Sequence, residues 1–89
     1  MNKIRFEFET DPKSFSYCLD IVQRMIVLFN ISENEALLRI NRRWIGLALK
    51  GEDDLIYHED EDYWANTIYF GKDSDWWKNP PNLNPLPLD

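Results

Sequence analysis

The chain has 89 residues, enough for one small domain, and its hydrophobic fraction of 44% argues against a disordered polymer. The net charge of −6 disfavours direct binding to nucleic acid or to an anionic membrane surface, because both are themselves negatively charged. The single cysteine, Cys18, excludes an intramolecular disulfide and suits a reducing compartment. The N-terminus lacks an apolar signal core, and the longest apolar run, residues 25–29, is too short to span a membrane. We therefore predict a cytoplasmic protein.

The charge is unevenly distributed along the chain. Residues 1–51 carry a net charge of +2, whereas residues 52–89 carry −8. Seven carboxylates lie between Glu52 and Asp62. An acidic surface attracts and orients a positively charged partner before contact. We therefore expect a basic protein partner and leave the oligomeric state open.

The first thirty residues indicate a strand pattern followed by a helix. Residues 3–9 alternate apolar and charged side chains, which is typical of a strand, and its partner would be residues 47–49 or 55–57. Asp11 and Pro12 favour a helix start, as an N-cap followed by proline at the first helical position. The apolar face of this helix comprises Phe15, Cys18, Leu19, Val22, Met25, Ile26 and Phe29. A helix with so broad an apolar face belongs at the centre of the core.

A second helix is indicated after a break at residues 30–32. Ser32 and Glu35 have the spacing of a capping box, in which each side chain accepts a hydrogen bond from the other residue's amide. Gly46 favours the end of this helix. The residues expected to face inward are Leu37, Ile40, Trp44 and Leu47. Three arginines are expected on other faces, paired with the acidic segment or solvated: Arg39, Arg42 and Arg43.

The acidic stretch opens after Gly51 and predicts a short third helix or an extended turn. Leu55 and Ile56 are expected to face the core. A further helix is then expected to begin at Asp60 or Glu61, where carboxylates suit the positive end of the helix dipole. Its inward stripe comprises Trp64, Ala65 and Ile68, and Gly71 closes it.

The C-terminal residues contain four of the five prolines and cannot form a helix. Trp76 and Trp77 are expected to cover the core. Residues 80–89 are then either a disordered tail or an extended strap whose leucines dock. We therefore predict one globular domain over residues 1–79 and a proline-rich tail over residues 80–89. The fold class is mainly α, with three or four short helices and an N-terminal extended segment that is a candidate strand.

No catalytic or metal signature accompanies the single histidine, His58. The sequence has no His-Glu-x-x-His pattern, no second histidine, no cysteine pair and no patterned calcium loop. Cys18 lies on an apolar helix face, where a packing role is favoured over reactivity. We therefore predict no catalytic residue, no metal and no cofactor.

The better hypothesis for the acidic stretch is a contact surface. Aromatic rings flanked by charges are typical anchors at protein interfaces. Tyr57, Tyr63 and Trp64 are embedded in the charged segment, outside a clean apolar stripe. The candidate partner-binding residues are Asp53, Asp54, Tyr57, His58, Glu59, Asp60, Tyr63 and Trp64.

The segment Asp54-Leu55-Ile56-Tyr57-His58-Glu59 resembles the Asp-Leu-Ile-Tyr-Tyr-Pro segment of the colicin DNase immunity proteins. The order of features is also similar, with an apolar first helix and a Ser-led, Glu-rich start to the second. That family consists of small acidic four-helix proteins that bind and silence a bacterial nuclease toxin. The resemblance implies that Asp54 and Tyr57 lie in a short third helix that touches the toxin. His58 and Glu59 replace the second tyrosine and the proline of that motif.

A second similarity, to small bacterial proteins of unknown role, rests on the pattern His-Glu-x-x-x-Tyr-Trp-Ala at residues 58–65 and implies no function. The leading hypothesis is a non-enzymatic acidic binding protein, of the toxin-immunity type, that engages a basic protein surface through residues 52–64. Two alternatives are a small structural or regulatory domain, and a metal-dependent enzyme that uses His58. The enzyme alternative would be excluded if elemental analysis found no bound metal and if a His58→Ala variant kept every measurable activity.

Overall fold

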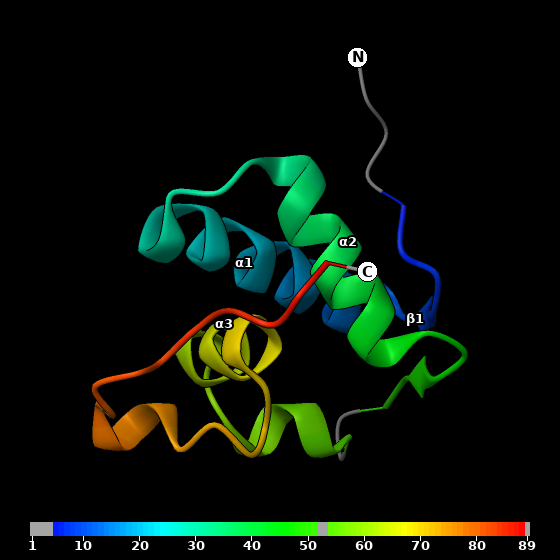
Figure 1. The fold of residues 1–89 in the computed structure, drawn as a ribbon. Coiled ribbons are helices and arrows are strands. Elements are labelled where there is room, and N and C mark those ends of the chain that lie inside the picture. Colours follow the sequence, from blue (N-terminus) through cyan, green and yellow to red (C-terminus); the bar gives the residue numbers. More distant parts are fainter. Residues whose placement is uncertain (1–4, 52–53, 89) are drawn as a thin grey trace.

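Three α-helices and two short strands are the main elements of the part of the chain that the structure describes. The computed structural model describes residues 5–51 and 54–88, and its first half contains β1 (Glu9–Thr10), α1 (Pro12–Phe29), α2 (Glu33–Trp44) and β2 (Ala48–Leu49). The second half contains the 3₁₀ helix η1 (Leu55–His58), α3 (Glu61–Phe70) and the 3₁₀ helix η2 (Trp76–Lys78). Figure 1 shows the C-terminal segment crossing α3 and ending beside α2. The chain is a small, mainly helical single domain with a two-stranded sheet, as the sequence predicts.

The N-terminal strand is shorter and later than predicted. β1 covers only residues 9 and 10, and it pairs in parallel with β2, in the register Glu9 with Ala48 and Thr10 with Leu49. The predicted strand over residues 3–9 is therefore wrong in its bounds, and residues 1–4 lie outside the described part of the chain. The apolar alternation has another cause, because Phe8 is buried and its ring stacks on Phe6 at 5.0 Å.

The helix starts follow the sequence closely. Asp11 and Ser14 form a capping box at α1, in which each side chain accepts the other's amide. Ser32 caps α2 by accepting from the amide of Glu35 at 3.0 Å. The predicted reciprocal bond is wrong, because the Glu35 carboxylate instead accepts from Arg39 Nε at 2.9 Å. α1 ends at Asn30, which adopts the left-handed conformation with φ 53°.

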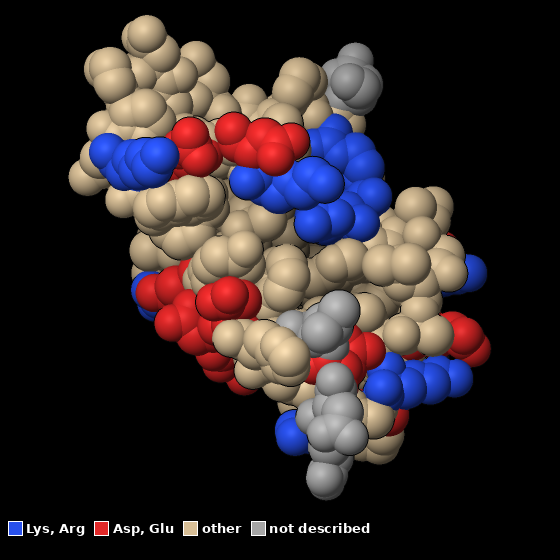
Figure 2. All heavy atoms as spheres, turned by 90° about the horizontal axis from the view of Figure 1, so that it is seen from below, with Lys and Arg blue, Asp and Glu red and all other residues tan. Residues whose placement is uncertain are grey.

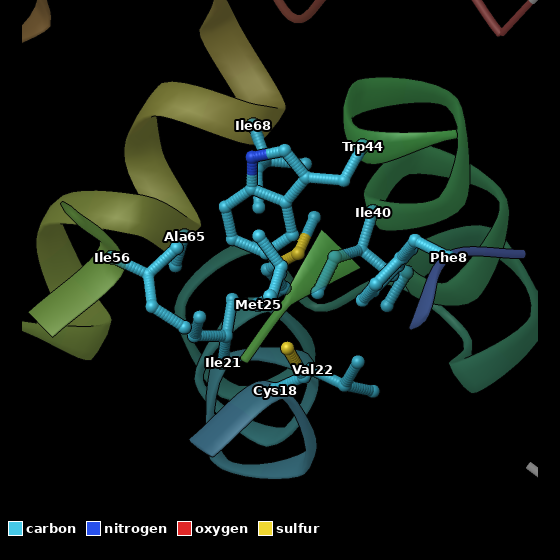
Figure 3. Close-up of a cluster of buried hydrophobic side chains, with 12 residues drawn as sticks. Phe8, Cys18, Ile21, Val22, Met25, Ile40, Trp44, Ile56, Ala65 and Ile68 are labelled. Atoms are coloured by element: carbon cyan, nitrogen blue, oxygen red, sulfur yellow. The ribbon is translucent and has the colours of Figure 1, made fainter. Parts of the chain in front are cut away.

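One hydrophobic cluster joins all three α-helices. Figure 3 shows Trp44 and Ile40 of α2 facing Met25 and Ile21 of α1. The buried members of the cluster are Phe8, Cys18, Ile21, Val22, Met25, Ala36, Ile40, Trp44, Leu49, Ile56, Ala65 and Ile68. The Trp44 ring meets Phe8 and Trp64 edge to face, with centroids 5.7 and 5.3 Å away. The N-terminal segment, α2 and α3 are therefore held together by one row of rings.

Four predicted environments are wrong. Phe15 and Leu47, expected to face inward, are exposed. Trp77 is also exposed, because Trp76 takes the place over the core and donates from Nε1 to the buried Thr67 hydroxyl at 3.2 Å. Arg39, expected in solvent or paired with the acidic segment, is only 5% exposed. Its burial is compensated by the Glu35 carboxylate, the ring of Tyr69 at 4.7 Å and a main-chain carbonyl of the C-terminal segment.

The C-terminal segment is extended and lies against α2 and α3. The Leu86 amide donates to the carbonyl of Tyr69, in the last turn of α3, at 2.8 Å. Arg39 Nη1 donates to the Leu86 carbonyl at 2.6 Å, and Arg42 donates to the Pro87 carbonyl. Residues 79–88 contain no helix, as their prolines predict. This segment is called the strap below, over residues 83–88.

Candidate functional site

The acidic segment is fixed to the core through its main chain. Asp54 begins η1 by accepting from the Ile56 amide at 3.1 Å, and Ile56 is buried. The indole Nε1 of Trp64 donates to the Ile56 carbonyl at 2.7 Å, and the Tyr17 hydroxyl donates to the Glu59 carbonyl. Because the main chain supplies these contacts, the side chains of several acidic residues remain available on the surface.

Asp60 caps the N-terminus of α3 and so fixes where this helix begins. The Asp60 carboxylate accepts from the Tyr63 amide at 2.8 Å, and Glu61 and Asp62 follow in the first turn. Free amides at a helix start carry partial positive charge, so carboxylates are stabilised there. Asp60 therefore has a structural role in addition to any role in binding.

The candidate partner-binding residues divide into two groups by exposure. His58, Glu59 and Asp60 are exposed. The others that the structure describes are half-buried: Asp54, Tyr57, Tyr63 and Trp64. Asp53 and the side chain of Leu55 lie outside the described part of the chain. The exposed part of this surface is thus mainly charged, and none of its three rings is fully exposed.

Tyr57 points its hydroxyl into the molecule. The hydroxyl oxygen is buried and has no hydrogen-bond partner among the described residues. The ring packs against Tyr17 at 5.2 Å, and Lys13 Nζ lies 4.5 Å from its centroid. Burial, then the nearby carboxylates of Asp11 and Asp54, raise the pKa of the hydroxyl. A partner can therefore contact only the exposed part of this residue and not its hydroxyl.

An acidic notch lies between α1 and the start of α3. It has a volume of about 420 Å³ and is lined by Asp20, Gln23, Arg24, Asp60, Glu61 and Asp62. Arg24 binds Asp62 through two hydrogen bonds, at 2.6 Å from Nε and 3.2 Å from Nη2. The hydrogen bond and then the charge of Asp62 raise the pKa of the guanidinium. The notch therefore holds four carboxylates and one internal cation, which leaves it strongly negative.

An apolar groove borders the same segment on another side. Its volume is about 490 Å³, and it is lined by Arg43, Trp44, Leu47, Ala48, Leu49, Asp54, Ile56 and Trp64. Trp44, Leu49 and Ile56 form a rigid floor because each is at most 5% exposed. Leu47, at the rim, is 49% exposed. Such a groove can accept an apolar side chain of a partner, with a charge of either sign at its border.

Sequence reasoning missed most of the lining of both surfaces. Asp20 lies more than thirty positions before the acidic segment, and nothing local indicates that α1 brings it to the start of α3. The sequence predicts residues 47–49 as a candidate partner strand, and Leu47 also as an inward-facing residue, but not as part of a groove. Among the candidates that the structure describes, only Asp54 and Trp64 line the groove, and only Asp60 lines the notch.

The carboxylates of this region are mostly unpaired. In residues 5–51 and 54–88, Arg24–Asp62 is the only ion pair that reaches the segment 54–64. Figure 2 shows a compact group of acidic side chains separated from the largest basic group by uncharged atoms. Across the described residues, no three His, Cys, Asp or Glu side chains are arranged to hold a metal ion. None of the helices in that part of the chain has the length and apolarity needed to cross a membrane.

The chain was compared with protein-family models, with curated protein sequences and with solved structures, and none of the three comparisons finds a match. The surface geometry therefore carries the functional argument.

Proposed function

We propose that this chain is a non-enzymatic binding protein that engages a basic surface of a protein partner through residues 52–64, in the manner of a toxin-immunity protein. The observation that carries the proposal is the position of the described part of this segment, residues 54–64. It borders a strongly acidic notch on one side and an open apolar groove on another. Interfaces commonly combine an apolar pocket that anchors the partner with charged groups that orient it.

The charges support a role in encounter. Glu59 is exposed and Asp20 lines the notch, and neither forms an ion pair among the described residues. Their negative potential is therefore not neutralised within that part of the molecule. Lysine or arginine side chains of a partner would be attracted to this surface, and the attraction would weaken as salt rises.

The groove supports a role in retention. Its floor is already ordered by the packing of Trp44 against Trp64, so an entering side chain would not have to organise it. Leu47 offers apolar surface at the rim. A short apolar or aromatic side chain of the partner would bury itself here, and its loss would be felt mainly in the dissociation rate.

The first test is affinity capture from the native cell, followed by purification of the captured protein and measurement of its association rate at low and high salt. Glu59→Lys and Asp20→Lys should each slow association by about tenfold at low salt, with less effect at high salt. The matched control is Asp73→Lys, which makes the same charge change at an exposed residue outside this surface. Equal slowing by the control, or capture of a partner whose contact surface is acidic, would refute the proposal.

The groove has a separate test with the same partner. Leu47→Ser should speed dissociation by about tenfold and leave association nearly unchanged. Val27→Ser is the matched control, because Val27 is 66% exposed on α1 and lines neither the notch nor the groove. If Leu47→Ser and Val27→Ser behave alike, the groove does not hold the partner, whatever the charges do.

A further inference from the structure

Contacts within α2 and α3 hold much of the surface beneath the strap in place. Arg39 is 5% exposed and is held by the Glu35 carboxylate on one side and the Tyr69 ring on another. Gly71 is fixed by its own amide, which donates to the Thr67 carbonyl at 2.8 Å. A third contact of Arg39, from its Nη1 to the Leu86 carbonyl at 2.6 Å, comes from the strap itself. The contacts from Glu35 and Tyr69 and the Gly71 amide bond do not involve the strap, and they should preserve most of this surface when the strap leaves it.

The strap is held almost entirely by its main chain. Two consecutive residues, Leu86 and Pro87, supply one amide and two carbonyls to Tyr69, Arg39 and Arg42. The Leu86 side chain lies over Gly71, where an added Cβ would come within 3.3 Å of it. These contacts are specific for an extended backbone with one leucine between two prolines. The prolines favour the extended conformation and have no amide hydrogen that would need a partner.

The strap is bound only weakly to this surface. Leu86 is 37% exposed and Leu88 is 45% exposed, so the leucines bury only part of their surface. The three hydrogen bonds, one of them donated by the buried Arg39, can be exchanged for equivalent bonds to another chain with the same backbone shape. The strap remains in place mainly because its short connection keeps it at a millimolar effective concentration.

We propose that the surface formed by Arg39, Arg42, Tyr69 and Gly71 is a binding site for an extended Pro-Leu-Pro segment of a partner protein, and that the chain's own residues 85–87 occupy it until such a segment displaces them. Figure 1 shows this arrangement, with the strap passing over α3 to the side of α2. The site is separate from the notch and the groove, since none of its four residues lines either. The proposal is thus independent of the acidic contact surface.

The test uses the full chain with Leu86→Pro, which removes the amide that donates to Tyr69 and so releases the strap. The probe is a fluorescently labelled peptide, Asn-Pro-Leu-Pro-Leu-Asp, followed by anisotropy. We expect it to bind the Leu86→Pro chain and to bind the unaltered chain about tenfold more weakly, as a strap that leaves about a tenth of the sites free would require. A control peptide with proline in place of its first leucine lacks the same amide and should not bind.

Neighbouring arginines provide matched controls on the receptor side. In the Leu86→Pro chain, Arg42→Met should weaken peptide binding several-fold, because Arg42 donates to the strap. Arg43→Met should leave it unchanged, because Arg43 is exposed and lines the apolar groove instead. Circular dichroism of each variant establishes that it is folded.

Three results would overturn the proposal. The first is no binding of the peptide to the folded Leu86→Pro chain at concentrations up to about 5 mM, the range in which a tethered strap competes. The second is equal loss of binding in the Arg42→Met and Arg43→Met variants. The third is a dimer of the unaltered chain that dissociates on the Leu86→Pro change, which would assign the site to the strap of a second copy.

Discussion

Variants of Asp60 can separate its structural role, as the cap of α3, from the contribution of its negative charge. Its carboxylate accepts the Tyr63 amide at 2.8 Å and begins a helix of ten residues that contributes Ala65 and Ile68 to the core. Aromatic and β-branched residues, which have weak helix propensity, make up much of this helix, so its start depends on the cap. We expect Asp60→Ala to lower the free energy of unfolding by about 1 kcal/mol. For a domain of this size, that corresponds to a fall in melting temperature of about 4–8 °C.

Two further variants isolate the cause. Asp60→Asn keeps a side-chain oxygen that can accept the Tyr63 amide, so it should cost only about 0.3–0.5 kcal/mol, from the lost charge at the helix start. Glu59→Gln removes the same charge one residue earlier, from an exposed side chain with no hydrogen bond among the described residues. It should change the stability by less than about 0.5 kcal/mol.

The assay is equilibrium unfolding in urea, followed by far-ultraviolet circular dichroism, with melting temperatures as a second measure. If Asp60→Asn loses as much stability as Asp60→Ala, the cap is not the source of the effect and the reasoning fails. If it does not, Asp60→Asn becomes the appropriate variant for testing the charge of this residue in partner binding, because its fold is preserved.

Three other expectations concern titration and packing. Burial, and then the Asp54 charge, raise the pKa of the Cys18 thiol from 9.0 to about 12, so its contribution to stability should be full below pH 9 and should be lost as the pH rises toward 12. The window from pH 9 to 10 isolates this thiol, because Tyr17, whose pKa is raised from 10.0, reduces stability mainly above pH 10. A Cys18→Ala variant whose stability falls as steeply in that window would contradict this reasoning. The amides of Gly51 and then Ser14 lower the pKa of Asp11 below 3.8, so its contribution to stability is present above pH 3.8 and is lost as the pH falls through the lowered value. Asp11→Asn should flatten the acid limb of an unfolding titration, and an unchanged limb would count against these bonds. Ile40→Val should cost about 0.5–1.5 kcal/mol in urea unfolding, against less than about 0.5 kcal/mol for Leu38→Ala at a site that is 61% exposed, and equal costs would place Ile40 outside the core.

Helix boundaries were predictable because their signals are local. Asp11 with Pro12, Ser32, Asp60 and Gly71 each act within three or four residues, and each lies at the expected helix end. The apolar periodicity then identified most of the residues that α1 contributes to the core. These features need no knowledge of which helix lies beside which.

The environment of Arg39 was not predictable from its neighbours in sequence. Its local pattern places it away from the apolar stripe, and only Glu35, four residues away, indicates a partner. The contacts that compensate its burial come from Tyr69, thirty positions later, and from the carbonyl of Leu86, 47 positions later. Similarly, the inward turn of Tyr57 depends on Tyr17 of α1. The acidic notch and the apolar groove are likewise products of tertiary contacts, so the sequence indicated one edge of each surface but not its opposite wall.

The two-stranded sheet is expected to form late in the folding of the chain. β1 and β2 meet across α1 and α2, so the loop that their pairing closes is long, and its closure costs conformational entropy that four paired residues cannot offset alone. The strands can therefore hold together only after the two helices have packed. The amide of Glu9, which donates to the Leu47 carbonyl at 2.9 Å, should consequently report on the docking of α1 and α2 in hydrogen-exchange measurements, although it belongs to neither helix.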